Sequence, residues 1–599
     1  MIYHCEDYTC NYWDEGEKLP ERCPQCGRKL LRANEADMTG DDWTALGNTL
    51  WDAEASDKKR MVDCFRKAAY LGSAWGVCNL GICMEQGNGV EADPVQAFWL
   101  YQQAVEMGSL NAVCCLGVCY EYGIGTAPDA EKAAELYCKA AEYGSPRGQM
   151  LLARAFHDGI GVEADAAEAV YWVRAAAYQR YGEGMYRLGV CYEYGDGVEQ
   201  NWEHAVHWFR EAAESGVSVA MAVLGYCYEK GCGVEQSWEQ AFSWYRRGAE
   251  CGYPVSMGNL GWCYKKGHGV EQNWQEAIKW YEQGAQCGDL QSMHNLACCY
   301  ERGEGVEQNE ERALYWYRRS AEGGNGVAMC NLGWCYKRGY GVEQNWQEAV
   351  KWYEQGAQCG NLQSMHSLAY CYERGEGVKQ NMTEAIRWYT AAAEGGNADD
   401  MYELGWQYDH GEGVEQDMKK AICWYERAAE QNHPAAMNSL GECYAMGRGV
   451  PRDLETAMEW YRRAAELGEA MADYNMGWHL EQAGKLSEAY THYRKAADGN
   501  DDSAWWALGR FYENGVVVVQ DGKEARRCYE TGEKLGSVKC KMRLARCKLL
   551  GIGGRRAKKA GLDLCRQALE LAKESSEKED YGYEAEMNLL RRTIAENES

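Results

Sequence analysis

The stretch that decides the fold is residues 255–286, VSMGNLGWCYKKGHGVEQNWQEAIKWYEQGAQ. Its apolar residues recur at helical spacing over 255–266 and again over 274–286, and the glycine-rich segment 267–270 separates the two runs. Two helices joined by so short a loop fold back on each other as a helix hairpin. Asn273 marks the start of the second helix, because an asparagine side chain at this place satisfies free backbone amides.

The same pattern returns every 36 residues along most of the chain. A repeat leucine, usually followed by glycine, carries the register at Leu80, Leu116, Leu152, Leu188, Leu224, Leu260, Leu296, Leu332, Leu368, Leu404 and Leu440, with Met476 next. The series extends to Leu46 before these positions and to Leu508 and Leu544 after them. One hairpin cannot bury its apolar side alone, so neighbouring units have to stack. We therefore predict an all-α solenoid of about fifteen helix hairpins.

The pattern A-x-x-x-L-G-x-x-Y-x-x-G-x-G-V…A-x-x-W-Y-x-x-A-A-x-x-G resembles the Sel-one-like repeat family, which is related to tetratricopeptide repeats. The resemblance implies a right-handed superhelical solenoid and an adaptor role in assembling other proteins. We assign the chain, in order, to a zinc-ribbon-like segment, a linker, the repeat solenoid and a C-terminal capping helix, at residues 1–30, 31–39, 40–575 and 576–599.

Composition excludes several classes of function. The 63 Lys and Arg residues against 91 Asp and Glu residues give a formal net charge of −28, which repels nucleic acid phosphates. No apolar run approaches the ~18 residues that span a bilayer, and the first residues lack the features of an export signal. We therefore expect a cytoplasmic protein with no nucleic acid partner and no membrane span.

The chain contains 29 cysteines, ten of which recur at one repeat position. Some secreted members of the family that it resembles carry a disulfide in each repeat, made by two cysteines eight residues apart. In this chain three cysteines at the first of these positions meet another residue at the second: Cys251 with Asn259, Cys287 with Asn295, and Cys359 with Ser367. We therefore expect reduced thiols that act as small core hydrophobes.

Four cysteines near the N-terminus have the spacing of metal ligands. Cys23-Pro24-Gln25-Cys26-Gly27 is typical of a zinc knuckle, which turns two thiolates toward one ion. The segment resembles a rubredoxin-like zinc ribbon, and we predict a structural Zn²⁺ held by Cys5, Cys10, Cys23 and Cys26. The wider spacing of the first pair leaves His4 as a substitute ligand. The alternative is an unstructured tail with free thiols.

A candidate partner site follows from the repeat register. By analogy with tetratricopeptide hairpins, the positions two and five after the repeat leucine face the concave surface. The first of these is aromatic at Tyr226, Trp262, Trp334, Tyr370, Trp406 and Trp478, and the second is charged at Glu229, Lys265, Glu301, Lys337, Glu373 and Asp409. Aromatic anchors among charges suit an extended peptide or a partner helix. The alternative, that the rings only pack on the next repeat, stays open.

The C-terminal end reverses the charge of the chain, with twelve Lys and Arg residues between Arg526 and Lys559. This basic C-terminal cap is either a solvated face or a dock for an acidic partner, including the acidic middle of a second copy.

We predict a protein–protein scaffold and not an enzyme. The rival interpretation is a hydrolase, because some cysteine-rich relatives in the family that the chain resembles have been described as β-lactamases. A Ser-x-x-Lys motif occurs at Ser56 to Lys59, where we expect a loop, but no Lys-Thr-Gly or Ser-Asp-Asn element accompanies it.

Overall fold

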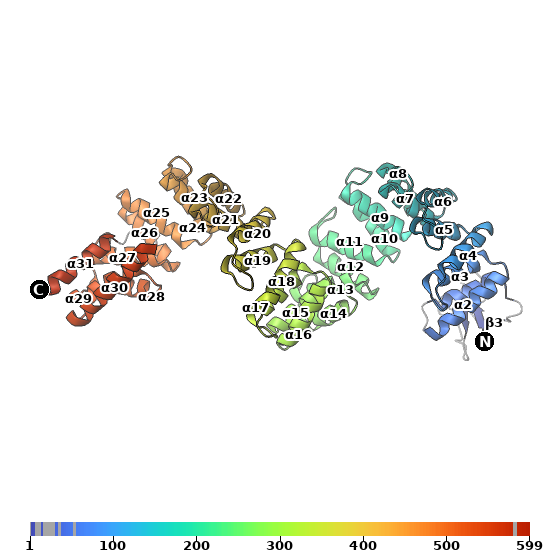
Figure 1. Cartoon of the computed structure of the whole chain (residues 1–599), viewed down its shortest axis with the longest axis horizontal. Helices are drawn as coiled ribbons and strands as arrows, with labels where there is room; N and C mark the ends of the chain where they lie inside the picture. Colours follow the sequence, from blue (N-terminus) through green and yellow to red (C-terminus); the bar gives the residue numbers. More distant parts are fainter. Residues whose placement is uncertain are drawn as a thin grey trace. The chain divides into compact units, whose positions relative to one another are not determined.

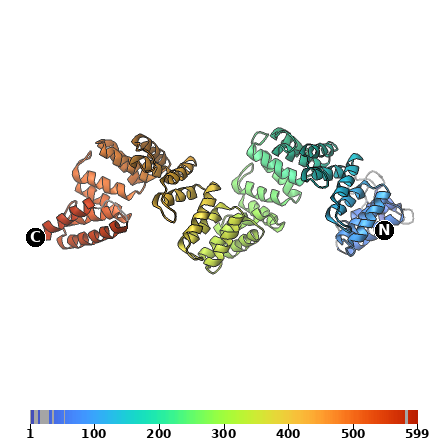
Figure 2. The same ribbon diagram turned by 45° about the horizontal axis from the view of Figure 1, so that its top comes forward.

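The computed structural model describes residues 2–5, 13–15, 30–33, 38–51, 55–578 and 584–598, and the side chains of residues 38–51, 57–573 and 584–597. The chain divides into two compact units, Met1–Asn309 and Glu310–Ser599. Within each unit, successive helices pack in pairs and each pair stacks on the next, as Figures 1 and 2 show. This arrangement confirms the predicted helical-repeat solenoid.

The first unit holds the strands β1 (Ile2–Cys5), β2 (Trp13–Glu15) and β3 (Leu30–Ala33). Its helices are α1 (Gly40–Thr49), α2 (Ala55–Tyr70), α3 (Ala74–Gln86), α4 (Pro94–Glu106), α5 (Leu110–Tyr122), α6 (Ala130–Glu142), α7 (Pro146–Asp158), α8 (Ala166–Tyr178), α9 (Gly182–Tyr194), α10 (Trp202–Glu214), α11 (Ser218–Lys230), α12 (Trp238–Glu250), α13 (Pro254–Lys266), α14 (Trp274–Gln286) and α15 (Leu290–Arg302).

The second unit holds the remaining helices of the described chain. They are α16 (Glu310–Glu322), α17 (Gly326–Arg338), α18 (Trp346–Gln358), α19 (Leu362–Arg374), α20 (Met382–Glu394), α21 (Ala398–His410), α22 (Met418–Glu430), α23 (Pro434–Met446), α24 (Leu454–Glu466), α25 (Ala470–Gln482), α26 (Leu486–Asp498), α27 (Asp502–Asn514), α28 (Gly522–Lys534), α29 (Val538–Leu550), α30 (Lys558–Lys578) and α31 (Glu584–Glu598).

The loop inside each hairpin is built on glycine because of its backbone conformation and its close packing. Gly267 and Gly269 have φ values of +74° and +69°, which side chains disfavour. A Cβ atom on Gly269 would lie 2.2 Å from the backbone oxygen of Trp238 in the preceding hairpin. After the loop, Asn273 accepts hydrogen bonds from the backbone amides at the start of α14, as expected, and the amide of Glu276 is 3.1 Å away.

The core of each hairpin is an aromatic ring from the second helix. Each ring is almost completely buried, and the residues at this core-ring position in α4 to α28 are Tyr101, Tyr137, Val173, Phe209, Tyr245, Tyr281, Tyr317, Tyr353, Tyr389, Tyr425, Tyr461, Tyr493 and Tyr529, with valine as the one exception. The ring explains the glycine after the repeat leucine. A Cβ atom on Gly261 would lie 2.7 Å from Cε1 of Tyr281.

The structure differs from our expectation at the motif Ser56 to Lys59, which we had placed in a loop. These residues form the first turns of α2 and do not lie in a loop, because the loop of this first unit is shortened and the second helix begins early. The loop of the Met476 unit is also short, since only residues 483–485 separate α25 from α26.

The N-terminal strands form one antiparallel sheet in the order β2-β1-β3. Ile2 of β1 pairs with Glu15 on one side and with Ala33 on the other. Strand β3 crosses the predicted boundary between residues 30 and 31. Cys5 is the last residue of β1, while Cys10, Cys23 and Cys26 lie outside the described residues, so the zinc ligands stay a prediction.

Candidate functional site

At the position five residues after the repeat leucine, many repeats carry an acidic side chain. Its carboxylate accepts a hydrogen bond from the hydroxyl of the core tyrosine in the same hairpin. The Tyr245 hydroxyl donates to Oε2 of Glu229 at 2.8 Å, sixteen residues earlier in the chain. We call this contact the Tyr–acid pair. It recurs at the same spacing in Tyr101–Glu85, Tyr137–Glu121, Tyr389–Glu373, Tyr425–Asp409 and Tyr529–Glu513. Burial, and then the Glu229 carboxylate, raise the pKa of Tyr245, so the phenol stays protonated and donates.

The Tyr–acid pair therefore accounts for three of the predicted partner-binding charges. Glu229 and Glu373 face a buried tyrosine hydroxyl of their own hairpin. Asp409 is only 3% exposed and also accepts a hydrogen bond from Arg448 at 2.9 Å. These carboxylates hold helices together within the chain.

Two repeats carry lysine in place of the acidic residue five positions after the repeat leucine, so they lack the carboxylate of the Tyr–acid pair. Lys265 forms an ion pair with Glu304 at 3.0 Å and lies over the ring of Trp274, 5.2 Å from its centroid. The hydroxyl of Tyr281, the core ring of this hairpin, is buried and has no hydrogen-bond partner among the described residues. Lys337 lies 4.6 Å from the ring centroid of Tyr370. These lysines therefore belong to an aromatic surface and not to the hairpin core.

In the first unit the predicted aromatic positions form a ring-lined surface. Tyr226 is 47% exposed. Trp262 is half-buried, with ring centroids 5.6 Å from Trp238 and 4.8 Å from His268. Because His268 lies in the loop of the same hairpin, part of the Trp262 ring is used to pack that loop. Glu301, the predicted charged residue near the end of α15, is half-buried.

In the second unit the remaining predicted rings lie on helices α17, α19, α21 and α25. Trp334 and Trp478 are 37% and 39% exposed. Trp406 is half-buried and stacks on His410 with ring centroids 4.5 Å apart. Tyr370 carries Lys337 on its ring face. These rings are thus partly exposed, and two of them contact a neighbouring side chain: Trp406 contacts His410 and Tyr370 contacts Lys337.

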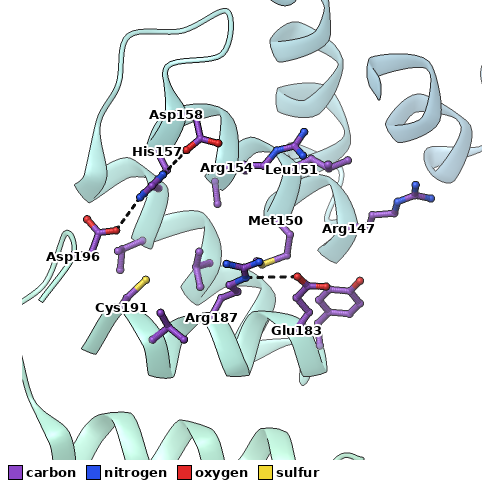
Figure 3. A pocket seen from close by; sticks show the side chains of 16 residues that line it. Arg147, Met150, Leu151, Arg154, His157, Asp158, Glu183, Arg187, Cys191 and Asp196 are labelled. Atoms are coloured by element: carbon purple, nitrogen blue, oxygen red, sulfur yellow. Dashed lines mark hydrogen bonds and ion pairs between the residues drawn. The ribbon is translucent and has the colours of Figure 1, made fainter. Parts of the chain in front are cut away.

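The structure adds a pocket that the sequence interpretation did not include. We call it the α7–α9 pocket: a cavity of about 540 Å³ in the first unit, seen from close by in Figure 3. It is lined by Arg147, Met150, Leu151, Ala153, Arg154, His157 and Asp158 of α7, by Ala169, Val170 and Val173 of α8, and by Tyr181, Glu183, Arg187, Val190, Cys191 and Asp196 in and around α9. Its floor is apolar and its rim is charged.

The rim holds a histidine between two aspartates. His157 contacts Asp158 at 2.6 Å through Nδ1 and Asp196 at 3.2 Å through Nε2. The hydrogen bond to Asp158 and the charge of Asp196 raise the pKa of His157. Figure 3 places this group at one end of the pocket and Arg147 at the other.

Three guanidinium groups complete the rim. Arg154 pairs with Glu121 at 2.5 Å, and its buried Nε has no hydrogen-bond partner in the described part of the chain. Arg187 pairs loosely with Glu183 at 3.6 Å on the surface. Arg147 donates to the Cys115 sulfur at 3.6 Å. The rim of the pocket therefore carries guanidinium donors as well as the carboxylate acceptors of Asp158, Glu183 and Asp196.

A signal for this pocket was present in the sequence. Arg154 and His157 stand two and five residues after Leu152, which are the positions that define the aromatic surface from two repeats later onward. The partner site was predicted only from the later repeats that carry aromatic residues, so the repeat of Leu152 was not included. Val173, at the core-ring position, was the second signal.

The comparisons with known proteins agree with the repeat geometry. The family described as Sel1 repeat matches thirteen segments: 76–109, 112–145, 146–181, 182–217, 218–253, 254–289, 290–325, 326–361, 362–397, 398–433, 434–469, 470–501 and 504–537. The chain belongs to the Sel1-repeat family. Sel1-repeat solenoids typically serve as protein–protein interaction scaffolds. Helix pairs α1–α2 and α29–α30 extend the stack beyond the matched segments.

Solved structures include similar Sel1-repeat proteins. The c5321 protein of uropathogenic Escherichia coli, a protective antigen with an SLR fold, is 31% identical, with 75% of this chain and 97% of that chain covered and a TM-score of 0.49. A Sel1 repeat protein from Oxalobacter formigenes is also 31% identical, with 41% and 96% covered and a TM-score of 0.37. Yeast Tom70 is 14% identical, with 89% and 97% covered and a TM-score of 0.29. No curated protein sequence matches.

The structure also bears on metal binding, the cysteines and membrane spans in this Sel1-repeat protein. Among the described residues, no group of three or more His, Cys, Asp or Glu side chains is arranged to hold a metal ion. His366, which is not among the predicted site residues, pairs with the buried Asp400 at 2.7 Å. Every cysteine from Cys64 to Cys565 is a free thiol. None of the helices in the described ranges is both long and apolar enough to cross a membrane.

Some arginines of the basic C-terminal cap form ion pairs with neighbouring helices of the solenoid. Arg543 lies 3.4 Å from Glu513 of α27 and 2.6 Å from Glu586 of α31, and Arg546 also pairs with Glu513. These pairs tie α29 to its neighbours. Lys558 and Lys559, in contrast, are exposed.

Proposed function

We propose that this Sel1-repeat protein is a non-enzymatic scaffold that binds an extended segment of a partner protein through the aromatic rings of its first helices. The observation that carries the proposal is the exposure of Tyr226 in the first unit and of Trp334 and Trp478 in the second, each on the first helix of its hairpin. Stacking does not require aromatic residues there, because Ile82 and Val118 occupy the position in early repeats. Exposed aromatic residues are enriched at binding hot spots, since they bury a large area at small entropic cost.

The charges next to the rings favour a partner of mixed or acidic character. Lys337 lies over the ring of Tyr370 and outside any Tyr–acid pair, so its ammonium group is placed to meet a carboxylate on the partner, whereas Lys265 is already paired with Glu304. Glu229, Glu373 and Asp409 are engaged inside their hairpins. Lys337 is therefore better placed than these carboxylates to determine the partner's register.

A triple substitution tests the proposal. Trp262, Trp334 and Trp406 replaced by Ala should abolish capture of the native partner while helical circular dichroism stays the same. The matched control is Trp99→Ala, which removes a ring that is 65% exposed on the second helix α4. Unfolding of the triple variant would identify the rings as core, and unchanged capture would place the site elsewhere.

We further propose the features that the geometry leaves untested: a structural zinc at Cys5, Cys10, Cys23 and Cys26, a cytoplasmic location with reduced thiols, and self-association through the basic C-terminal cap. Zinc analysis of the full chain, with Cys23→Ser and Cys26→Ser as the control, tests the first. Thiol counting in denaturant, expected to approach 29 less any zinc-bound groups, tests the second. Nitrocefin hydrolysis above the blank rate would favour the alternative hydrolase.

A further inference from the structure

The α7–α9 pocket exists because one hairpin lacks its core ring. The even-numbered helices from α4 to α28 carry Tyr or Phe at the core-ring position. The exception is α8, which carries Val173. Valine is too short to cross the space between the two helices. Val173 itself is buried and lines the pocket, together with Ala153 on the facing helix α7.

The second half of the Tyr–acid pair is missing from the same hairpin. His157 stands sixteen residues before Val173, where Glu121 and Glu229 stand before Tyr137 and Tyr245. Both His157 and Val173 line the pocket. The cavity thus lies between the two positions that a phenol ring and its acceptor bridge elsewhere in this chain.

We propose that the α7–α9 pocket accepts a tyrosine side chain of a bound partner, whose ring takes the place that the chain's own core ring has in the other hairpins. The ring would cover Val170 and Val173 on the floor. Its hydroxyl would meet Asp196 on the rim, whose carboxylate is the hydrogen-bond acceptor in place of the missing glutamate. A purely apolar side chain would leave this polar end without a partner.

The rim also suits the polypeptide on either side of such a tyrosine. Arg147, Arg154 and Arg187 place guanidinium groups around the opening, and Arg187 is only loosely paired, with Glu183 at 3.6 Å. Carbonyl or carboxylate groups of a peptide are the complementary acceptors. We expect acidic or neutral residues beside the anchoring tyrosine.

The pocket continues the face that we propose for partner binding. Arg154 and Val190 occupy the position two after the repeat leucine, as Tyr226 does in α11 of the same unit. This inference rests on the proposed scaffold function, but its test does not need the partner. Failure of the pocket test would leave the aromatic surface standing, and failure of the tryptophan test would leave the pocket standing.

The test uses p-cresol, the tyrosine side-chain analogue, and the full-length protein. Ligand-observed NMR should detect p-cresol binding in the millimolar range. Val173→Tyr should reduce that binding at least tenfold, because the chain's own ring then fills the pocket, and the melting temperature should not fall. Absence of binding to the wild type, or equal binding to folded Val173→Tyr, would overturn the proposal.

Two further measurements sharpen the assignment. Tyr245→Val empties the matched hairpin α11–α12 and should create a second p-cresol site; if that variant is unfolded, the Val173→Tyr comparison still decides. Toluene, which lacks the hydroxyl, should bind several-fold more weakly than p-cresol, and equal binding would overturn the choice of tyrosine. Self-association that disappears in Val173→Tyr would replace the partner with a second copy of the chain and overturn the proposal in that form.

Discussion

Hairpins α11–α12 and α7–α8 share one backbone plan but differ in their interiors. In α11–α12 the ring of Tyr245 fills the space between the helices and its hydroxyl bonds to Glu229. In α7–α8 the corresponding residues are Val173 and His157, and a pocket of about 540 Å³ takes the place of the ring. The comparison teaches that the repeat tolerates loss of its core ring, and that this loss converts a closed interior into a recess.

The largest expected effect comes from emptying the closed hairpin. Tyr245→Ala should destabilise it by about 3–5 kcal/mol, the usual cost of deleting a buried aromatic side chain. Val173→Ala in the open hairpin should cost only about 1.5 kcal/mol, at roughly 0.8 kcal/mol per buried methyl group. Hydrogen exchange of α11–α12 and α7–α8 peptides measures both. Equal costs would mean that the two interiors do not differ as described.

The next effect isolates the hydroxyl. Tyr245→Phe leaves Glu229 without its buried donor and should cost about 1–3 kcal/mol. Tyr281→Phe is the matched control, because the Tyr281 hydroxyl has no partner among the described residues. Its removal should be neutral or stabilising. Urea titration of both variants gives the difference, and an equal loss in the two would contradict the role assigned to the Tyr–acid pair.

A gain of stability is expected when the open hairpin is closed. Val173→Tyr combined with His157→Glu recreates the Tyr–acid pair in α7–α8, and the two changes should couple favourably by about 1 kcal/mol, the net value of one hydrogen bond. A double-mutant cycle on thermal unfolding measures the coupling. Simple additivity would show that the new ring does not reach the new carboxylate.

The smallest effect concerns pH. The contacts of His157 with Asp158 and Asp196 raise its pKa in the folded state, so their contribution to stability is complete below the unfolded value of about 6.5 and is lost as the pH rises through the folded pKa. The effect is small because the imidazole is mostly exposed. In NMR titrations Asp158→Asn should lower the pKa of His157 more than Asp196→Asn does. The reverse order would contradict the geometry.

Much of the fold was predictable from local spacing. The predicted helices 255–266 and 274–286 agree with α13 and α14 to within one residue. Helix periodicity and the glycine loop are local signals, and the 36-residue repeat supplies many copies of each. The motif at Ser56 was misplaced because the second helix of the first unit already begins at Ala55, so that Ser56 lies in its first turn.

The candidate site was predictable only in part. The positions two after the repeat leucine carry accessible rings, such as Tyr226 and Trp334. The positions five after it were interpreted as one charged row, but Asp409 is buried while Lys337 lies over a ring. Helical spacing gives the face of a residue, but its partner lies on another helix and depends on how the two cross.

The sequence by itself determined the repeat register, the helix limits and the need for glycine in each loop, because these depend on residues close together in the chain. Only the tertiary structure decided which side chains meet across helices. The sixteen-residue link between Glu229 and Tyr245 became visible there, and with it the meaning of Val173 and His157. A cavity is a property of the packing around it, so the shortened side chain could be seen in the sequence, but not the space that it leaves.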